Sequence, residues 1–255
     1  MNELTIDHSE KFPNLSNAPI VEAVLNWQAM ASSEYREDEL LKRLTTDFSD
    51  YSGTTQHNLQ AGLQLSGNDL ELQQHKAWQG VRLVKEGGDP KSPQSVCQFL
   101  KQGILFSRLA PYKNWEEFEQ EAKKFWDKHC EIGDPAEVFC LSVRFISQID
   151  LNSIDEVSDH IETVCQPVAE LSLTAEQFFH QDTIQLANEP YIINVVRTAQ
   201  PDSEKKLKLI IDITVSTSSS FDISLVDEKL KDLRFIKNKL FFTLMRNAAQ
   251  NVGGA

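Results

Sequence analysis

Two charged side chains stand inside otherwise apolar stretches, and they are the first candidates for chemistry. Glu22 occupies the middle of the run Ile-Val-Glu-Ala-Val over residues 20–24, and Arg144 stands between Val143 and Phe145. A charge inside a buried strand is costly unless an opposite charge pairs with it. We expect Glu22 and Arg144 to form an ion pair that fixes the register of two neighbouring strands. A ligand-reading or catalytic role for either residue is the alternative.

Histidine and cysteine side chains show no spacing typical of a metal site or an activated nucleophile. No two histidines are four residues apart, no Cys-x-x-Cys occurs, and nothing resembles the Gly-x-Ser-x-Gly turn of a hydrolase. The pair Gly87-Gly88 lacks the Lys-Ser/Thr of a phosphate-binding loop, so it indicates a hairpin turn. We therefore predict no cofactor and no metal, and a protein that is not an enzyme is favoured. The residues concerned are His8, His57, His75, His129, His160 and His180, with Cys97, Cys130, Cys140 and Cys165.

The overall charge limits the classes of partner. The 255 residues carry a formal net charge of −13, which disfavours nucleic acid and an anionic membrane surface because both bind through Lys and Arg. No stretch reaches the roughly 18 apolar residues of a membrane span, and the polar start of the chain lacks the apolar core of a signal peptide. The scattered cysteines fit buried, reduced thiols. The sequence therefore predicts a cytoplasmic location.

An aromatic stripe marks a predicted helix that begins after Asn114. Asn114 and Glu117 form a capping box, and apolar side chains then recur every three or four residues. We predict that this stripe packs in the core, with the lining of a pocket between helix and sheet as the alternative. The candidate pocket-lining residues are Trp115, Phe118, Phe125 and Trp126.

A basic patch is predicted on the last helix, which Ser224 and Asp227 are expected to cap. Cations near the end of a helix are favourable, so a solvated face is the simplest interpretation. In so acidic a chain, the patch is also the region best suited to an acidic partner or nucleic acid. Its residues are Lys231, Arg234, Lys237 and Lys239, flanked by Lys229 and Arg246.

The order of predicted elements repeats along the chain. After an irregular lead-in over residues 1–16, residues 17–133 predict a strand, a helix capped by Ser32 or Ser33, several strands and a long helix. Residues 134–250 predict the same order again. We therefore predict an α+β fold, mainly antiparallel sheet with long helices packed on it, either as two pseudo-repeated halves or as one continuous domain.

The predicted strands differ in how deeply they are buried. The strand from Pro19 to Met30 is apolar on both sides, so we expect both of its faces to be covered. Turns are predicted at Gly67-Asn68, between Gly87 and Pro90, and at Gln102-Gly103. Further strands are predicted over 57–66, 69–75, 78–86, 95–108, 138–149, 174–186, 190–199 and 206–216, and a second-half helix is predicted to begin at Ser153.

Four segments together resemble a sporadically distributed, uncharacterised bacterial protein family of about this length. The first is the opening strand Asn17–Val24, Asn-Ala-Pro-Ile-Val-Glu-Ala-Val, and the second is a Tyr-x-x-Trp helix start at Tyr112 and Trp115. The third, Val143–Ile149, is similar to the family's Arg-Tyr-Ile-Asn-Arg-Ile strand. The fourth is the strand Leu209–Ile213 with the Phe-rich helix that follows it. In the third segment Phe145, Ser147 and Gln148 depart from the family's Tyr, Asn and Arg.

The resemblance implies a bacterial origin and one architecture, but no activity. A sporadic occurrence is typical of accessory genes such as those of phage defence and toxin neutralisation. We therefore expect a non-enzymatic protein-interaction component of such a module, with a basic protein partner encoded nearby and with homo-oligomerisation open. The alternatives are a small-molecule or lipid binding module with a cavity between sheet and helix, and a metal-dependent enzyme with a dispersed carboxylate site.

Overall fold

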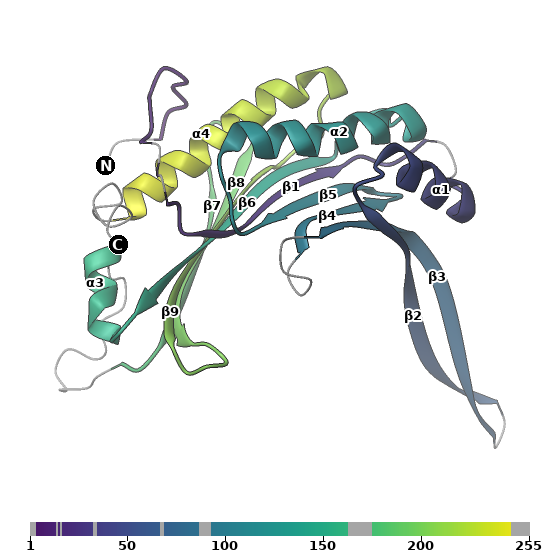
Figure 1. The fold of residues 1–255 in the computed structure, drawn as a ribbon, viewed down its shortest axis with the longest axis horizontal. Helices are drawn as coiled ribbons and strands as arrows, with labels where there is room; N and C mark the ends of the chain where they lie inside the picture. The colour runs from purple at the N-terminus through teal and green to yellow at the C-terminus, as the bar shows by residue number, and fades with distance from the viewer. Residues whose placement is uncertain are drawn as a thin grey trace.

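One antiparallel sheet of nine strands organises the computed structural model, which describes residues 4–13, 15, 17–32, 35–66, 69–86, 93–162 and 175–245. The strand order is β2-β3-β4-β5-β1-β6-β9-β8-β7 (Figure 1). The strands are β1 (Ile20–Gln28), β2 (Ser52–Ser66), β3 (Asp69–Glu86), β4 (Pro93–Leu100), β5 (Gly103–Leu109), β6 (Cys140–Leu151), β7 (Phe178–Gln185), β8 (Tyr191–Pro201) and β9 (Leu207–Thr217). Antiparallel pairing of β1 with β6 joins the strands before residue 134 to those after it.

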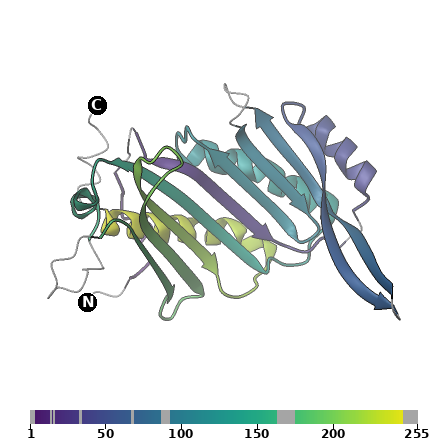
Figure 2. The same cartoon turned by 90° about the horizontal axis from the view of Figure 1, so that it is seen from below.

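Helices cover one face of this sheet. The helices α2 (Trp115–Gly133) and α4 (Val226–Leu244) lie across it, and α1 (Glu37–Asp47) packs near β2 and β3 (Figure 1). The short α3 (Val157–His160) lies at the opposite end of the sheet. The other face, here named the bare face, carries no helix in the described part of the chain (Figure 2). None of the described helices is both long and apolar enough to cross a membrane.

The alternation of side chains along β1 explains which face the helices cover. Leu25 and Trp27 have no exposed surface, and the Trp27 ring stacks on Trp126 of α2 with 5.7 Å between centroids. The alternate residues Glu22 and Val24 point to the bare face, because successive side chains of a strand point in opposite directions. The expectation that a second layer covers both faces of this strand is therefore wrong, since the helices lie on the Trp27 side.

The predicted capping box at the start of α2 is confirmed. The Asn114 side chain accepts a hydrogen bond from the backbone N–H of Glu117 at 2.8 Å. The aromatic stripe then faces the sheet, where the Phe125 ring lies 5.4 Å from the ring of Phe106 on β5 and 5.1 Å from that of Tyr51. Periodicity alone therefore predicted the buried face of this helix correctly.

Two predicted helix starts are corrected. The helix α1 begins at Glu37 rather than after Ser32, and Ser33 lies outside the described residues. Before α4, a 3-10 turn, η2 (Ile223–Leu225), is capped by Asp222, whose carboxylate accepts the backbone N–H of Ser224 at 2.9 Å. The predicted Ser224–Asp227 box is wrong because the 3-10 turn places Ser224 inside the capped segment rather than at its start.

Strand and helix lengths also differ from the prediction. The ranges 69–75 and 78–86 form one strand, β3, because Lys76 and Ala77 between them stay paired with Leu59 and Asn58 of β2. The turn at Gln102-Gly103 is confirmed, since β4 ends before it and β5 begins at it. The helix predicted from Ser153 is a 3-10 turn, η1 (Ile154–Glu156), followed by α3, which ends at His160. The predicted turns at Gly67-Asn68 and Gly87–Pro90, and Cys165, lie outside the described residues.

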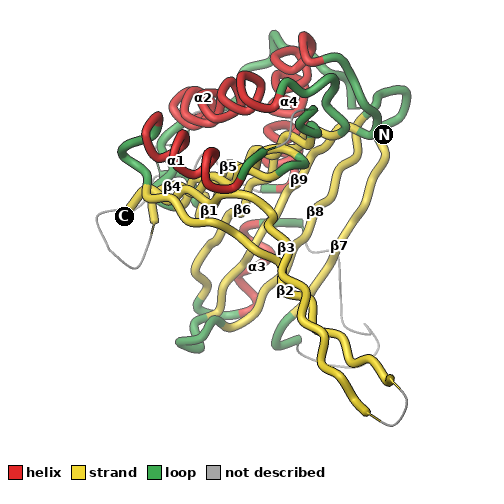
Figure 3. Tube along the Cα trace, turned by 90° about the vertical axis from the view of Figure 1, so that its right-hand side faces the viewer, coloured by secondary structure: helices red, strands yellow, loops and turns green. Residues whose placement is uncertain are grey.

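Part of β2 and β3 projects from the body of the sheet. Residues 57–66 of β2 pair with residues 69–78 of β3, whereas β3 pairs with β4 only from Gly80 onward. We name this paired segment the β-arm. Figures 1 and 3 show that it bends away from the helices, toward the side of the bare face.

The turn between β4 and β5 requires glycine at position 103. Gly103 has φ of 140°, and a Cβ at this position would lie 1.9 Å from the carbonyl oxygen of Trp27. Beside it, the backbone N–H of Ala29 donates to the carbonyl of Gln102 at 2.9 Å. The turn is therefore closed directly against the end of β1.

Replacing Gly103 by alanine should lower the free energy of unfolding by about 2 kcal/mol or more, because the Cβ collides with backbone in a conformation that disfavours L side chains. Urea unfolding followed by circular dichroism measures the change. Gln102→Ala, at the exposed neighbouring position, is the control and should change stability by less than about 0.5 kcal/mol. Equal stability of the two variants would contradict the close approach.

Candidate functional site

Glu22 and Arg144 both point to the bare face, but each has a different partner from the one expected. The Arg144 guanidinium donates from Nε to the two carboxylate oxygens of Asp212 at 2.9 and 3.1 Å. The Glu22 carboxylate accepts a hydrogen bond from the Ser107 hydroxyl. In the β1–β6 register, Arg144 lies opposite Val24. Glu22 is two residues before Val24 on the same face, so it lies opposite Ile146 rather than Arg144. The predicted Glu22–Arg144 ion pair is therefore corrected to an Arg144–Asp212 pair beside Glu22.

Around this pair, the bare face is poor in charge. The row through Arg144 has one residue from each strand: Thr183, Asn194, Thr214, Arg144, Val24, Ser107, Val96, Val84 and Ser52. The row on one side has Gln181, Val196, Asp212, Ile146, Glu22 and Leu109, and the row on the other has Gln185, Ile192, Ser216, Ser142, Asn26, Leu105, Gln98, Arg82 and Thr54. Charges in these rows are confined to Glu22, Arg82, Arg144 and Asp212, and they balance in sign.

The predicted basic patch of α4 is divided among different environments. Arg234 donates to Glu116 at 2.8 Å, and its guanidinium lies 5.3 Å from the Trp115 ring centroid. Lys239 pairs with Glu10 of the N-terminal segment at 2.7 Å. Lys231 is exposed, and Lys237 turns inward toward the sheet. The four cations therefore do not form one solvated patch, and Arg246 lies outside the described residues.

Three of the candidate residues, one aromatic and two basic, line the same cavity. Trp115 at the start of α2 lines a cavity between α2 and α4 with Arg234 and Lys237. The other aromatic candidates remain in the core, because Phe118, Phe125 and Trp126 are at most 4% exposed. The aromatic stripe therefore serves packing along most of its length and borders a cavity only at its first residue.

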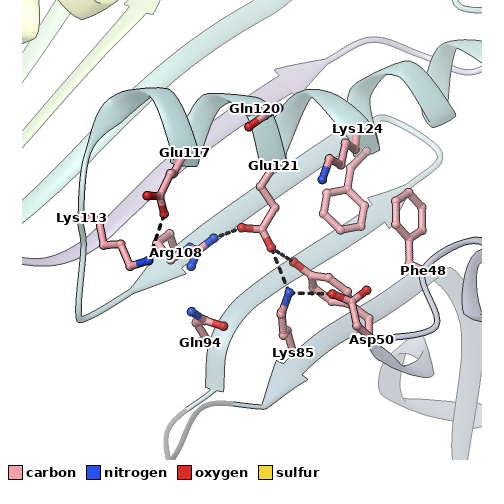
Figure 4. Close-up of a pocket in the computed structure, with 12 residues that line it drawn as sticks. Phe48, Asp50, Lys85, Gln94, Arg108, Lys113, Glu117, Gln120, Glu121 and Lys124 are labelled. Atoms are coloured by element: carbon pink, nitrogen blue, oxygen red, sulfur yellow. Dashed lines mark hydrogen bonds and ion pairs between the residues drawn. The ribbon is translucent and has the colours of Figure 1, made fainter.

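A second cleft, of about 320 Å³, opens between α2 and strands β3 to β5 and is centred on Glu121 (Figure 4). The Glu121 carboxylate accepts from the Tyr51 hydroxyl at 2.5 Å and forms an ion pair with Arg108. Lys85 lies 3.8 Å from Glu121 and 2.6 Å from Asp50. Glu121 and Arg108 have side chains only 15% and 12% exposed, so each partly buried charge is neutralised locally.

The groups of this cleft are tuned by burial and by their neighbours. Burial raises the pKa of Tyr51 well above its usual value and lowers the pKa of Arg108. The hydrogen bond from Lys85 lowers the pKa of Asp50. Tyr51 therefore stays protonated as a donor to Glu121. The cleft therefore holds a network of acids and bases around Glu121, which stabilises the contact between helix and sheet.

Sequence reasoning missed Glu121, although a signal was present. Glu121 comes three residues after Phe118 and four before Phe125, which places it on the buried side of the helix. A carboxylate at such a position predicts a cationic partner from the sheet. Arg108, which supplies it, is preceded by the alternating apolar residues of β5.

Neither a search for a metal site nor comparison with known proteins assigns a function to these residues. Within the described ranges, no three His, Cys, Asp or Glu side chains are grouped so that they could hold a metal ion. Comparisons with protein-family models, with curated proteins and with solved structures find no match.

Glu121→Gln should lower the free energy of unfolding by about 3 kcal/mol, because it leaves the guanidinium of Arg108 partly buried without a counter-charge. Glu117→Gln on the same helix is the matched control. Glu117 pairs with Lys113 at 3.3 Å with both side chains more than half exposed, so its loss should change stability by less than about 1 kcal/mol. Urea unfolding measures both variants, and similar values for the two would contradict the role assigned to Glu121.

Proposed function

We propose that this protein is a non-enzymatic interaction component whose bare sheet face binds a protein partner. The observation that carries the proposal is the poverty of charge in the three central rows of that face, which hold only Glu22, Arg82, Arg144 and Asp212, in a chain of which 25% of residues are charged. The centres of protein interfaces are depleted in charged residues, whereas ordinary solvated surfaces are rich in them. The Val, Ile and Leu side chains of the three rows, interspersed with Ser, Thr and Asn, supply apolar contact and hydrogen-bonding groups.

The shape of the sheet supports the same proposal. The β-arm extends beyond one end of the bare face and bends toward its side (Figures 1 and 3). A partner lying on the bare face would contact the arm as well, which enlarges the buried area. The strand β2 is also an edge of the sheet, so its outer backbone groups are available for strand addition.

The charge of the chain favours a basic protein partner. A net charge of −13 attracts a cationic surface over a distance of about 10 Å at moderate salt and speeds its association. The balanced charges at the centre of the bare face then fix orientation rather than total attraction. The resemblance to a sporadically distributed bacterial family supports a place for this complex in a defence or toxin-neutralising module.

The two halves of the chain are, we infer, related by a pseudo-twofold axis between β1 and β6. In each half the first strand lies at the centre of the sheet and pairs with the last strand of its own half, β5 or β9. A helix of 19 residues follows that last strand in both cases, α2 or α4. The first half contains one more strand, β2, than the second.

Ser142→Arg, at the centre of the bare face on β6, should abolish co-purification with the products of neighbouring genes, or weaken the affinity at least about tenfold, because a buried cation without a partner opposes binding. Size-exclusion chromatography with light scattering measures the complex. Gln120→Arg, on the exposed side of α2, adds the same side chain away from the bare face and should leave the complex intact.

Circular dichroism and thermal unfolding establish that both variants are folded. A complex that survives Ser142→Arg, or that is lost equally with Gln120→Arg, would overturn the assignment of the bare face. A dimer of this chain that Ser142→Arg dissociates would place a second copy there instead of a basic partner.

A further inference from the structure

The cavity that Trp115, Arg234 and Lys237 line has the size and walls of a small-molecule site. Its volume is about 330 Å³, which is within the range of ligand pockets. It is bordered by the N-terminal segment, by residues 112–116 and by α4, and it opens to solvent. Its walls combine polar side chains with five aromatic ones: Phe12, Tyr112, Trp115, Phe241 and Phe242. The rings of Phe12 and Phe242 stack with 5.7 Å between centroids, so the N-terminal segment closes one side.

Lys237 is the polar group of this cavity that lacks a counter-charge. Its Nζ lies 4.0 Å from the ring centroid of Phe145 on β6, and it makes no hydrogen bond or ion pair with any other described residue. Glu116, the one carboxylate among the described lining residues, is already bound by Arg234 at 2.8 Å. Contact with an aromatic ring compensates only partly for the lost hydration of an ammonium group.

Among the described residues that line the cavity, no carboxylate is left free to pair with Lys237. The segment 112–116 contributes Lys113 and Glu116, and α4 contributes Arg234. The sheet contributes Phe145, and the described lining residues of the N-terminal segment are uncharged. Burial, and then the positive charge of Arg234, lower the pKa of Lys237 to about 7. Near neutral pH the amine is therefore poised to take up a proton when a negative charge approaches.

We propose that this cavity binds a small aromatic carboxylate, with the carboxylate held by Lys237 and the ring packed between the aromatic walls. A carboxylate would supply the missing counter-charge through a charge-assisted hydrogen bond. Arg234, fixed over the Trp115 ring, provides a second cation at the cavity wall. The ligand would bind on the helical side of the sheet, so this site is independent of the bare face.

Isothermal titration calorimetry with 2-naphthoate tests the proposal, with its neutral methyl ester as the comparison probe. The wild-type protein should bind the acid at least about tenfold more tightly than the ester. Lys237→Met should weaken binding of the acid at least about tenfold, because the side chain keeps its apolar stem and loses its charge. Lys42→Met, at an exposed position of α1 that does not line the cavity, is the control and should bind like the wild type.

A second measurement on the wild-type protein does not depend on any variant. Titrations near neutral pH in buffers of different ionisation enthalpy should show net proton uptake on binding, because the ligand's negative charge raises the pKa of Lys237. Lys237→Met should abolish that uptake. Absence of binding, equal binding of acid and ester, or binding without proton uptake that Lys237→Met leaves unchanged would overturn the proposal.

Discussion

The register between β1 and β6 is the constraint on which the rest of the structure depends. It aligns Leu25 with Val143 and Trp27 with Leu141, and all four side chains are buried under the helices. A slip of one residue would turn Trp27 toward the bare face and Glu22 toward the helices. The same register places Arg144 beside Asp212 of β9. Core packing and the pattern of the bare face therefore have one common origin.

Two partly buried charged side chains differ in whether the protein itself supplies a partner. This difference distinguishes a charge that stabilises the fold from one that can bind a ligand. Glu121 is surrounded by Tyr51, Arg108 and Lys85, so its charge is satisfied within the protein. Lys237 faces the Phe145 ring, and the one carboxylate among the described residues of its cavity, Glu116, is already bound by Arg234. A satisfied charge joins elements of the fold, whereas an unsatisfied one favours whatever anion can reach it.

Local signals in the sequence predicted local structure correctly. They did not predict which residues pair across the sheet. The Asn114 cap and the aromatic stripe depend on residues three or four apart, so periodicity was sufficient for both. The partner of Arg144 lies 68 residues away on another strand, and its choice depends on strand order, which single-sequence patterns do not contain. The late start of α1 and the long β3 reflect tertiary packing and the continuous pairing of β3 with β2, which override local propensity.

The central place of β1 also determines the order in which the chain can fold during synthesis. One edge of β1 pairs with β5, which ends at Leu109, but the other edge must wait for β6, which begins at Cys140. At ribosomal speed that interval lasts on the order of a few seconds. Until then β1 is an apolar edge strand, open to wrong partners. The growing chain therefore passes through a half-sheet whose aggregation is prevented only when the second half arrives.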